Sequence, residues 1–307
     1  MADDFRLIML SAMYENGGNV THRFLDGHPQ MFVYPFESQL GTKLVNDHLS
    51  SMFPVKYRWP VFDLGATPQQ DYQAIIDEEV KVRARTPRVS KFRHVAFDFS
   101  DDERREIYER YISESGRSRA HNVAGFFRAT FAAWKDYRRS GSEQVYVGYS
   151  PIVVIDAKKI LTDFPTAHIV HVVRNPWSAF ADTKKRAVPL SLAHYLLAWN
   201  MNQQQALFFQ ERFPESVHII RFEDVISDSQ VTLGKICEEV GVSSAPSLKT
   251  PTWNGTTLME VYPWGTIRSA TPEANRATAL ELSEAERDEV RARAGHYLEV
   301  FDYQHFI

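Results

Sequence analysis

Short apolar runs alternate along this chain with longer segments that carry apolar residues at helical spacing. The runs are β-prone, and capping residues mark where several of the intervening segments begin. The run HIVHVV is nearly all apolar, which is typical of a strand covered on both faces in a parallel sheet. Strands alternating with helices predict an α/β fold with a central parallel sheet flanked by helices. The predicted strands are 5–10, 31–34, 145–149, 168–173 and 217–221.

Capping patterns locate the helices between these strands. Thr67 followed by Pro68 predicts the start of a helix that continues to about Arg85. Ser100 with Glu103 has the spacing of a capping box, and the same spacing at 283 and 286 starts the last helix. The remaining helices are predicted at 19–26, from 123 to near 141, at 156–164, at 191–213 and around 233–240.

The segment 246–275 has little periodicity and several Pro, Thr and Gly residues, which predicts a long loop. The aromatic residues Trp253, Tyr262 and Trp264 favour a packed, functional loop over a disordered one. The other connections are too short to separate independent units. We therefore expect one domain over residues 1–307.

Composition narrows the class of protein. With 44% hydrophobic residues and a net charge of −4, the chain is neither a disordered tail nor a general nucleic-acid binder, although one basic pocket for a small anion remains compatible. No run approaches the ~20 apolar residues of a membrane helix. The acidic start lacks the basic segment of a secretory signal, and the lone Cys237 cannot form an internal disulfide. These features predict a cytoplasmic protein.

The first candidate site follows the N-terminal strand. A helix that starts directly after a strand presents free N–H groups and the positive end of its dipole. Gly17 and Gly18 allow close approach of a phosphate, and Asn19 and Thr21 offer side-chain donors. The Walker pattern is absent, which disfavours an ordinary P-loop kinase. A glycine turn that only caps the helix is the alternative interpretation.

The second candidate site is Arg174, at the carboxyl end of the strand HIVHVV. Doubly wound folds bind ligands at this edge of the sheet, and a guanidinium group suits bidentate phosphate contact. Asn175 and Pro176 predict a turn into a helix. A structural ion pair is the alternative role for Arg174.

Taken together, the glycine-bearing loop before FLDGHPQM, the segment VHVVRNP and the segment IIRFEDV resemble the sulfotransferase family, in this order and over most of the chain. The resemblance implies a P-loop-like sulfotransferase fold and the use of 3′-phosphoadenosine 5′-phosphosulfate (PAPS) to sulfate a hydroxyl or an amine. It also implies that the phosphosulfate is held by a loop and first helical turn made of Asn16, Gly17, Gly18, Asn19, Val20 and Thr21.

The resemblance assigns further residues. Arg174 falls on the arginine that binds the 3′-phosphate, and Trp264, Gly265 and Thr266 lie where a loop closes over the nucleotide. Glu37 lies just past the second strand, close to the catalytic glutamate of tyrosylprotein-type sulfotransferases. It is our first choice as general base, with His94 and His121 in reserve and a solvated or salt-bridged carboxylate as the alternative.

Three positions depart from the family pattern. Glu15 stands where a cation usually precedes the loop, Asp182 replaces a serine that follows the arginine, and residues 147–150 lack a Lys-Thr-His segment. Either Glu15 points away from the phosphosulfate or another cation compensates. Ser178 or Thr183 could supply the missing donor at the 3′-phosphate. The candidate cations are Lys91, Arg93, Lys184, Lys185 and Arg186.

We therefore expect a PAPS-dependent transferase that acts on a small-molecule or carbohydrate acceptor by in-line displacement. Tyr149 and Trp253 are candidates for lining the acceptor pocket. No metal site is expected, because His168 and His171 should point to opposite faces of a strand and HExxH and CxxC are absent. A nucleotide-dependent phosphotransferase and a non-catalytic nucleotide or partner binder are the alternatives. The oligomeric state stays open.

Overall fold

The computed structural model describes residues 4–258 and 270–307, and within them a parallel sheet forms the centre of the molecule. Its strand order, β2-β3-β1-β4-β5, puts β1 in the middle between β3 and β4. The predicted strands and their parallel arrangement are confirmed. The strands are β1 (Leu7–Ser11), β2 (Met31–Val33), β3 (Val145–Tyr149), β4 (His168–Val173) and β5 (Val217–Arg221).

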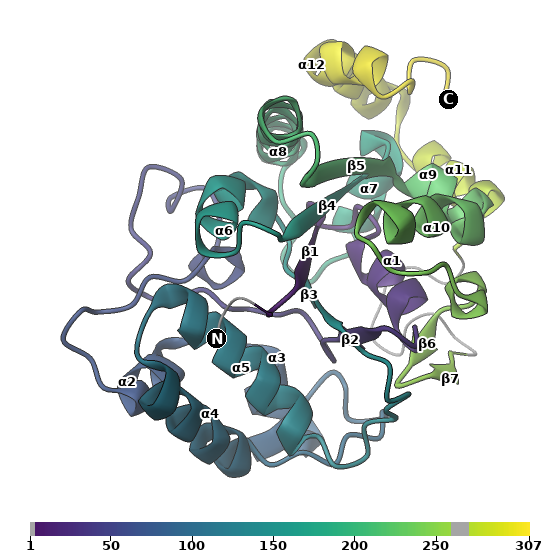
Figure 1. Ribbon diagram of the computed structural model, residues 1–307. Helices are drawn as coiled ribbons and strands as arrows, with labels where there is room; N and C mark the ends of the chain where they lie inside the picture. The colour runs from purple at the N-terminus through teal and green to yellow at the C-terminus, as the bar shows by residue number, and fades with distance from the viewer. Residues whose placement is uncertain (1–3, 259–269) are drawn as a thin grey trace.

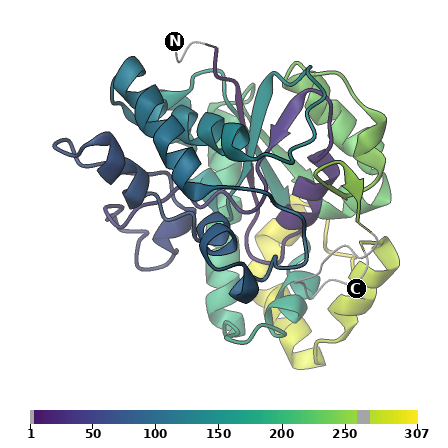
Figure 2. The same ribbon diagram turned by 90° about the horizontal axis from the view of Figure 1, so that it is seen from below.

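Helices cover both faces of this sheet, as Figures 1 and 2 show. Leu7 and Met9 of β1 belong to one apolar cluster and Ile8 and Leu10 to the other, because neighbouring residues of a strand point to opposite faces. The Ile8 side is covered by α1 (Gly18–Leu25) and α10 (Ser229–Glu239). The Leu7 side is covered by α5 (Arg119–Ala133), α6 (Ala157–Asp163) and α8 (Leu192–Arg212).

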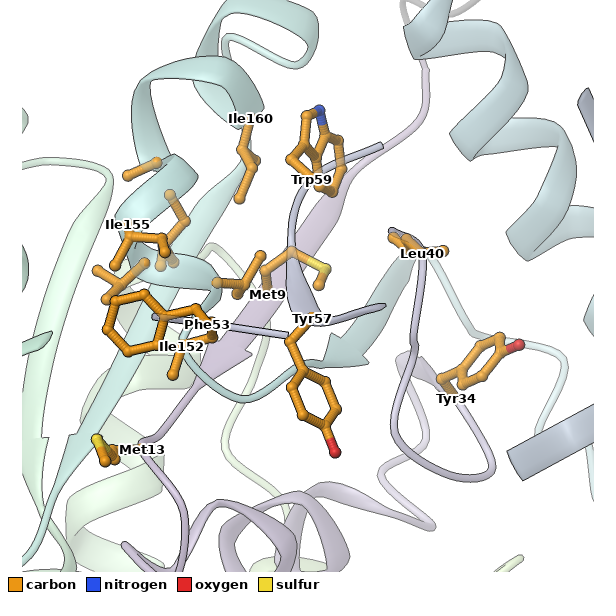
Figure 3. Packing of buried hydrophobic residues seen from close by; sticks show 14 of the residues in the cluster. Met9, Met13, Tyr34, Leu40, Phe53, Tyr57, Trp59, Ile152, Ile155 and Ile160 are labelled. Atoms are coloured by element: carbon orange, nitrogen blue, oxygen red, sulfur yellow. The ribbon is translucent and has the colours of Figure 1, made fainter. Parts of the chain in front are cut away.

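The larger cluster continues beyond the sheet into a group of helices. Figure 3 shows Met9 of β1 among buried side chains that include Trp59 and Ile160. In this region α4 packs along α5. The other elements of this part are η1 (Val55–Tyr57), α2 (Pro68–Ala74), α3 (Glu78–Arg85), η2 (Pro87–Val89) and α4 (Asp101–Ser115).

The prediction of one helix from Pro68 to about Arg85 is wrong. Thr67 does cap the start, but α2 ends at Ala74 and α3 begins at Glu78. Between them Asp77 has a φ of 36°, and its buried carboxylate accepts hydrogen bonds from Tyr34 Oη at 2.8 Å and Arg104 Nη1 at 2.7 Å. The tertiary ion pair with Arg104 therefore overrides the helical pattern.

Several boundaries also differ from the prediction. The helix predicted from 123 to near 141 is α5, which begins at Arg119 and ends at Ala133, and η3 (Val153–Asp156) precedes α6. The segment 246–275 is not a continuous loop. Ser100 and Ser283 cap α4 and the last helix as predicted. The elements not yet given are α7 (Pro176–Thr183), α9 (Phe222–Ser227), η4 (Pro246–Lys249), β6 (Thr252–Trp253), β7 (Thr256–Thr257), α11 (Pro272–Leu280) and α12 (Glu284–Val300).

Candidate nucleotide and acceptor site

The glycine-bearing loop lies at the carboxyl end of the central strand and opens α1. Gly17 is the N-cap of α1, and the first intrahelical bond runs from Thr21 N to Gly17 O at 2.9 Å. The amide groups of Gly18, Asn19 and Val20 therefore come before the hydrogen-bond ladder of the helix. The positive end of the helix dipole adds to these donors, so the loop has the chemistry of an anion site.

Both glycines of the loop are required by close packing. Gly17 has a φ of 85°, and a Cβ atom at this position would lie 2.1 Å from the ring of Phe222. A Cβ atom on Gly18 would lie 2.4 Å from the ring of Tyr149. The rings of Phe222 and Tyr149 thus pack directly against the backbone of the loop. Tyr149, predicted as an acceptor residue, is 4% exposed and packs against the loop.

Asn16 joins the loop to the second phosphate motif. Its Oδ1 atom accepts hydrogen bonds from Arg174 N at 3.1 Å and from Trp199 Nε1 at 3.0 Å. Its Nδ2 atom donates to Tyr14 O at 2.9 Å and to Tyr195 Oη at 3.1 Å. The fully buried amide therefore fixes the end of β1 against the end of β4.

Arg174 is buried and already has several partners. Its Nη1 atom donates to Glu15 O and to Asp182 Oδ2, each at 2.8 Å, and its Nε atom donates to Asn275 Oδ1 at 2.8 Å. The guanidinium carbon lies 5.2 Å from the centre of the Phe222 ring. The structural ion pair considered for this arginine is thus present, and it is formed with the residue that departs from the family pattern.

The carboxylate of Glu223 accepts hydrogen bonds from three side chains near Arg174. The sequence pattern alone did not identify Glu223 as a functional residue. Its Oε1 atom accepts from Asn175 Nδ2 at 2.7 Å and from Asn275 Nδ2 at 2.9 Å, and its Oε2 atom accepts from Tyr303 Oη at 2.7 Å. The segment IIRFEDV contains this glutamate. The motif therefore indicated where Glu223 lies in the chain, but it did not predict which residues Glu223 contacts.

The predicted donors at the 3′-phosphate position bond to protein groups. Ser178 Oγ donates to Asn275 O at 2.7 Å, and Thr183 Oγ1 donates to Ala179 O at 2.8 Å. Asn275 belongs to the first turn of α11, and the predicted loop 246–275 includes this turn. Trp264, Gly265 and Thr266 lie outside the described residues.

Arg186 is the predicted cation that approaches Glu15. Its Nε atom lies 3.9 Å from Glu15 Oε1, and its guanidinium carbon lies 5.2 Å from the centre of the Tyr14 ring. Burial raises the pKa of Glu15, while Arg186 lowers it. Three other candidate cations form ion pairs with carboxylates other than Glu15: Lys91 with Glu79, Lys184 with Glu286, and Lys185 with Asp182.

Glu37 lies in a buried polar cluster beyond β2. Its backbone N–H donates to Glu79 Oε2 at 3.1 Å, and its Oε2 atom accepts from Gln39 Nε2 at 3.3 Å. Burial raises the pKa of Tyr57, and the neighbouring charge of Glu37 raises it further. Burial and the neighbouring charge of Glu37 raise the pKa of Glu79 to about 8, although its ion pair with Lys91 opposes this shift.

Tyr14 lies between the Glu37 cluster and the glycine-bearing loop. Its ring centre lies 6.0 Å from that of Tyr57, and its hydroxyl is buried with no hydrogen-bond partner in the described part of the chain. Burial raises the pKa of Tyr14, and the charge of Glu37 raises it further. The charge of Glu37 therefore acts on Tyr14, which lies two residues before Asn16 in the chain.

The other candidates lie in different surroundings. His94 is exposed, and His121 Nδ1 lies 2.9 Å from Gly116 O near the start of α5. Trp253 is buried, with its ring 5.0 Å from that of Phe36 and its Nε1 atom donating to Ala96 O. Cys237 is buried in the α10 core, where burial raises the pKa of its thiol to about 11.

The structure separates the two histidines of β4. His168 Nδ1 lies 3.0 Å from His218 Nε2, whereas His171 Nε2 lies 3.0 Å from Gln203 Oε1. Within residues 4–258 and 270–307, no group of three or more His, Cys, Asp or Glu side chains is arranged to hold a metal ion. No helix in these ranges is long and apolar enough to cross a membrane.

Comparison with protein families gives a match to the sulfotransferase family over residues 17–246, three quarters of the chain. The chain belongs to the sulfotransferase family. The match includes Gly17, Arg174 and the segment IIRFEDV, so the resemblance seen in the sequence is confirmed. The parallel sheet flanked by helices, with the glycine loop after β1, is the predicted sulfotransferase fold.

Several solved sulfotransferase structures are similar to this structure, although their sequences have low identity to this chain. The sulfotransferase domain of the olefin synthase of Synechococcus is 15% identical, covers 91% of this chain and 94% of its own, and has a TM-score of 0.49. The corresponding domain from the curacin biosynthetic pathway is 14% identical, with coverage of 94% and 96% and a TM-score of 0.49. A sulfotransferase from Alicyclobacillus acidocaldarius is 14% identical, with coverage of 93% and 89% and a TM-score of 0.46. Sequence comparison with curated proteins gives no match.

Proposed function

We propose that this sulfotransferase family member transfers a sulfuryl group from PAPS to a hydroxyl group of an acceptor. The contact between Asn16 and Arg174 carries the proposal, because it joins a glycine loop that suits one phosphate to an arginine that suits the other. PAPS would supply an activated sulfuryl group and a bisphosphate leaving group. The residues Gly17 to Thr21 would bind the phosphosulfate and Arg174 the 3′-phosphate.

Glu37 is the proposed general base. It would accept the proton of the acceptor hydroxyl as the acceptor oxygen bonds to sulfur and the bond from sulfur to the phosphate oxygen breaks. The hydrogen bond from Gln39 would orient its carboxylate. The amide groups at the start of α1 would stabilise the charge that spreads over the leaving group. The cytoplasmic location and the single domain remain predictions from the sequence.

Calorimetric titration with adenosine 3′,5′-bisphosphate tests the nucleotide site. Loss of charged hydrogen bonds in Arg174→Ala should weaken binding about 10- to 100-fold. Arg105→Ala removes the same charge from α4, outside the site, and should bind as the wild type does. Equal binding by the wild type and Arg174→Ala would contradict the assignment.

A sulfuryl-transfer assay tests the base. Glu37→Gln should lower kcat about 10²- to 10⁴-fold without loss of bisphosphate binding. Glu114→Gln, at an exposed position of α4, is the matched control.

The ion pair between Arg174 and Asp182 favours one alternative, a non-catalytic nucleotide binder. In that case the wild type would bind the bisphosphate weakly and no acceptor would be sulfated.

A further inference from the structure

A groove opens beside the Glu37 cluster, between α3 and the segment 89–92. It has a volume of about 290 Å³. This is near the lower end of the volumes of small-molecule sites. Its lining includes the buried residues Gln39, Glu79 and Phe92.

Each of these three residues touches Glu37 or its neighbour. Gln39 donates to the Glu37 carboxylate at 3.3 Å, and Glu79 accepts from the Glu37 amide at 3.1 Å. The ring of Phe92 stacks on Phe36 with the centres 3.9 Å apart. A molecule lying in the groove would therefore have one end next to the proposed base.

The charged residues of the groove are already paired with each other. Lys56 Nζ lies 2.7 Å from Glu78 Oε2, and Lys91 forms an ion pair with Glu79. Each cation of the groove therefore already contacts a carboxyl group. An acceptor with its own charge would compete with one of these pairs, whereas a neutral acceptor leaves both intact.

Apart from Ser90, the remaining residues that line the groove are apolar. Val82 and Phe92 line the groove, and Val89 lies at its edge with 75% of its surface exposed. Covering such a side chain with an apolar group is favourable, whereas a polyol would leave its own hydroxyl groups without partners along this wall.

We propose that this groove binds the acceptor and that the acceptor is a neutral alcohol with an apolar body. The assignment rests on the proposed sulfuryl transfer. The apolar body lies against Val82, Val89 and Phe92, and the hydroxyl group reaches Glu37 past Gln39. During transfer the alcohol oxygen bonds to sulfur, its proton goes to Glu37, and adenosine 3′,5′-bisphosphate leaves.

Octanol is the probe for this site, with ω-hydroxyoctanoate and ω-aminooctanol as charged analogues of the same length. Saturation-transfer NMR on the full chain with adenosine 3′,5′-bisphosphate measures binding, and a transfer assay with PAPS measures kcat/KM. Octanol should bind more tightly than either analogue and have the highest kcat/KM. Val89→Glu should weaken octanol binding about tenfold or more, because it replaces an apolar contact with a charge.

Matched variants separate this inference from the proposed function. Val89→Leu should retain octanol binding, and Val231→Glu places the same charge on α10, away from the groove. Bisphosphate binding should be equal in all three variants. Octanol binding that is absent, or unchanged by Val89→Glu, would overturn the groove assignment, as would a preference for a charged analogue. If the wild type does not bind the bisphosphate, the proposed function is contradicted. The change in octanol binding caused by Val89→Glu would still test the groove.

Discussion

Arg174 and Asp182 form a buried ion pair, with Arg174 Nη1 2.8 Å from Asp182 Oδ2. The second carboxylate oxygen of Asp182 lies 3.0 Å from Lys185 Nζ, and this lysine also pairs with Glu281. The proposed 3′-phosphate site therefore contains its own carboxylate. A phosphate that approaches Arg174 would meet the negative charge of Asp182, which opposes its binding.

Replacing Asp182 by serine, the usual family residue, should strengthen nucleotide binding. Asp182→Ser removes the opposing charge and adds a hydroxyl donor. We expect the Kd of adenosine 3′,5′-bisphosphate to fall about tenfold, which corresponds to ~1.4 kcal/mol. Isothermal titration calorimetry at low salt measures the change.

The same substitution should destabilise the protein without ligand. Removing one partner of a buried ion pair costs about 3–5 kcal/mol, although Lys185 and the Glu15 carbonyl limit this cost. Titrations therefore need temperatures well below the melting temperature of the variant. Asp288→Ser, at an exposed ion pair of α12, is the control. Unchanged or weaker bisphosphate binding by folded Asp182→Ser would show that Asp182 does not oppose the phosphate.

Asn16→Ala tests how the two phosphate motifs are held together. The change leaves the Arg174 amide and the Trp199 indole N–H without their acceptor. Each buried donor that loses its partner costs about 1–3 kcal/mol. Urea unfolding should show a corresponding loss of stability, and bisphosphate binding should weaken in the folded protein. Asn200→Ala, which loses one bond to Arg293 O on the surface, should lose much less stability. Similar losses for both variants would contradict this role of Asn16.

Local patterns were sufficient to predict the strands and the position of the glycine-bearing loop after β1. Apolar runs and glycines act over a few residues, so β1, β4 and Gly17 could be identified directly. The break between α2 and α3 could not, because it depends on a tertiary ion pair between Asp77 and Arg104.

The positions of the candidate site residues could be predicted from the sequence, but their contacts with one another could not. Arg174 was found from its place after a buried strand, and the departure at Asp182 was visible in the sequence. Their mutual ion pair, and the bond from Arg174 to Asn275 far along the chain, depend on how α7 and α11 pack together. Residue spacing contains no signal for these contacts.

Gly17→Ala should disable the nucleotide loop. The left-handed backbone costs a residue with a Cβ atom about 1–2 kcal/mol, and the new methyl group would also overlap the Phe222 ring. We expect lower stability by thermal unfolding and loss of measurable bisphosphate binding. Adding Phe222→Leu should recover part of the stability, because it relieves the overlap but not the backbone strain.

Gly295→Ala is the matched control for this substitution. No atom lies within 4 Å of a Cβ atom built on Gly295, a helical position of α12. The change should stabilise the protein by about 0.5–1 kcal/mol, since alanine favours helix over glycine. Normal bisphosphate binding by Gly17→Ala would indicate that the loop backbone does not hold the phosphosulfate.

Glu79 should make the stability of the protein depend on pH. Its pKa rises from an ordinary value of 4.5 to about 8 in the folded state, because burial and the charge of Glu37 disfavour its ionised form. Between these two values the folded protein binds more protons at this carboxyl group than the unfolded chain does. The contribution to stability is therefore complete below the unfolded pKa and is lost as the pH rises through the folded one.

Glu79→Gln removes this titration and should flatten the corresponding part of the pH profile. The variant should gain stability relative to the wild type as the pH rises from about 5 to about 8, as measured by urea unfolding across this range. Lys91 loses its partner in the variant, but this loss is a nearly constant offset because Lys91 stays charged below its raised pKa. Glu114→Gln, at an exposed position, should run parallel to the wild type. A difference between Glu79→Gln and the wild type that does not change with pH would show that Glu79 titrates at the same pH in the folded and unfolded states.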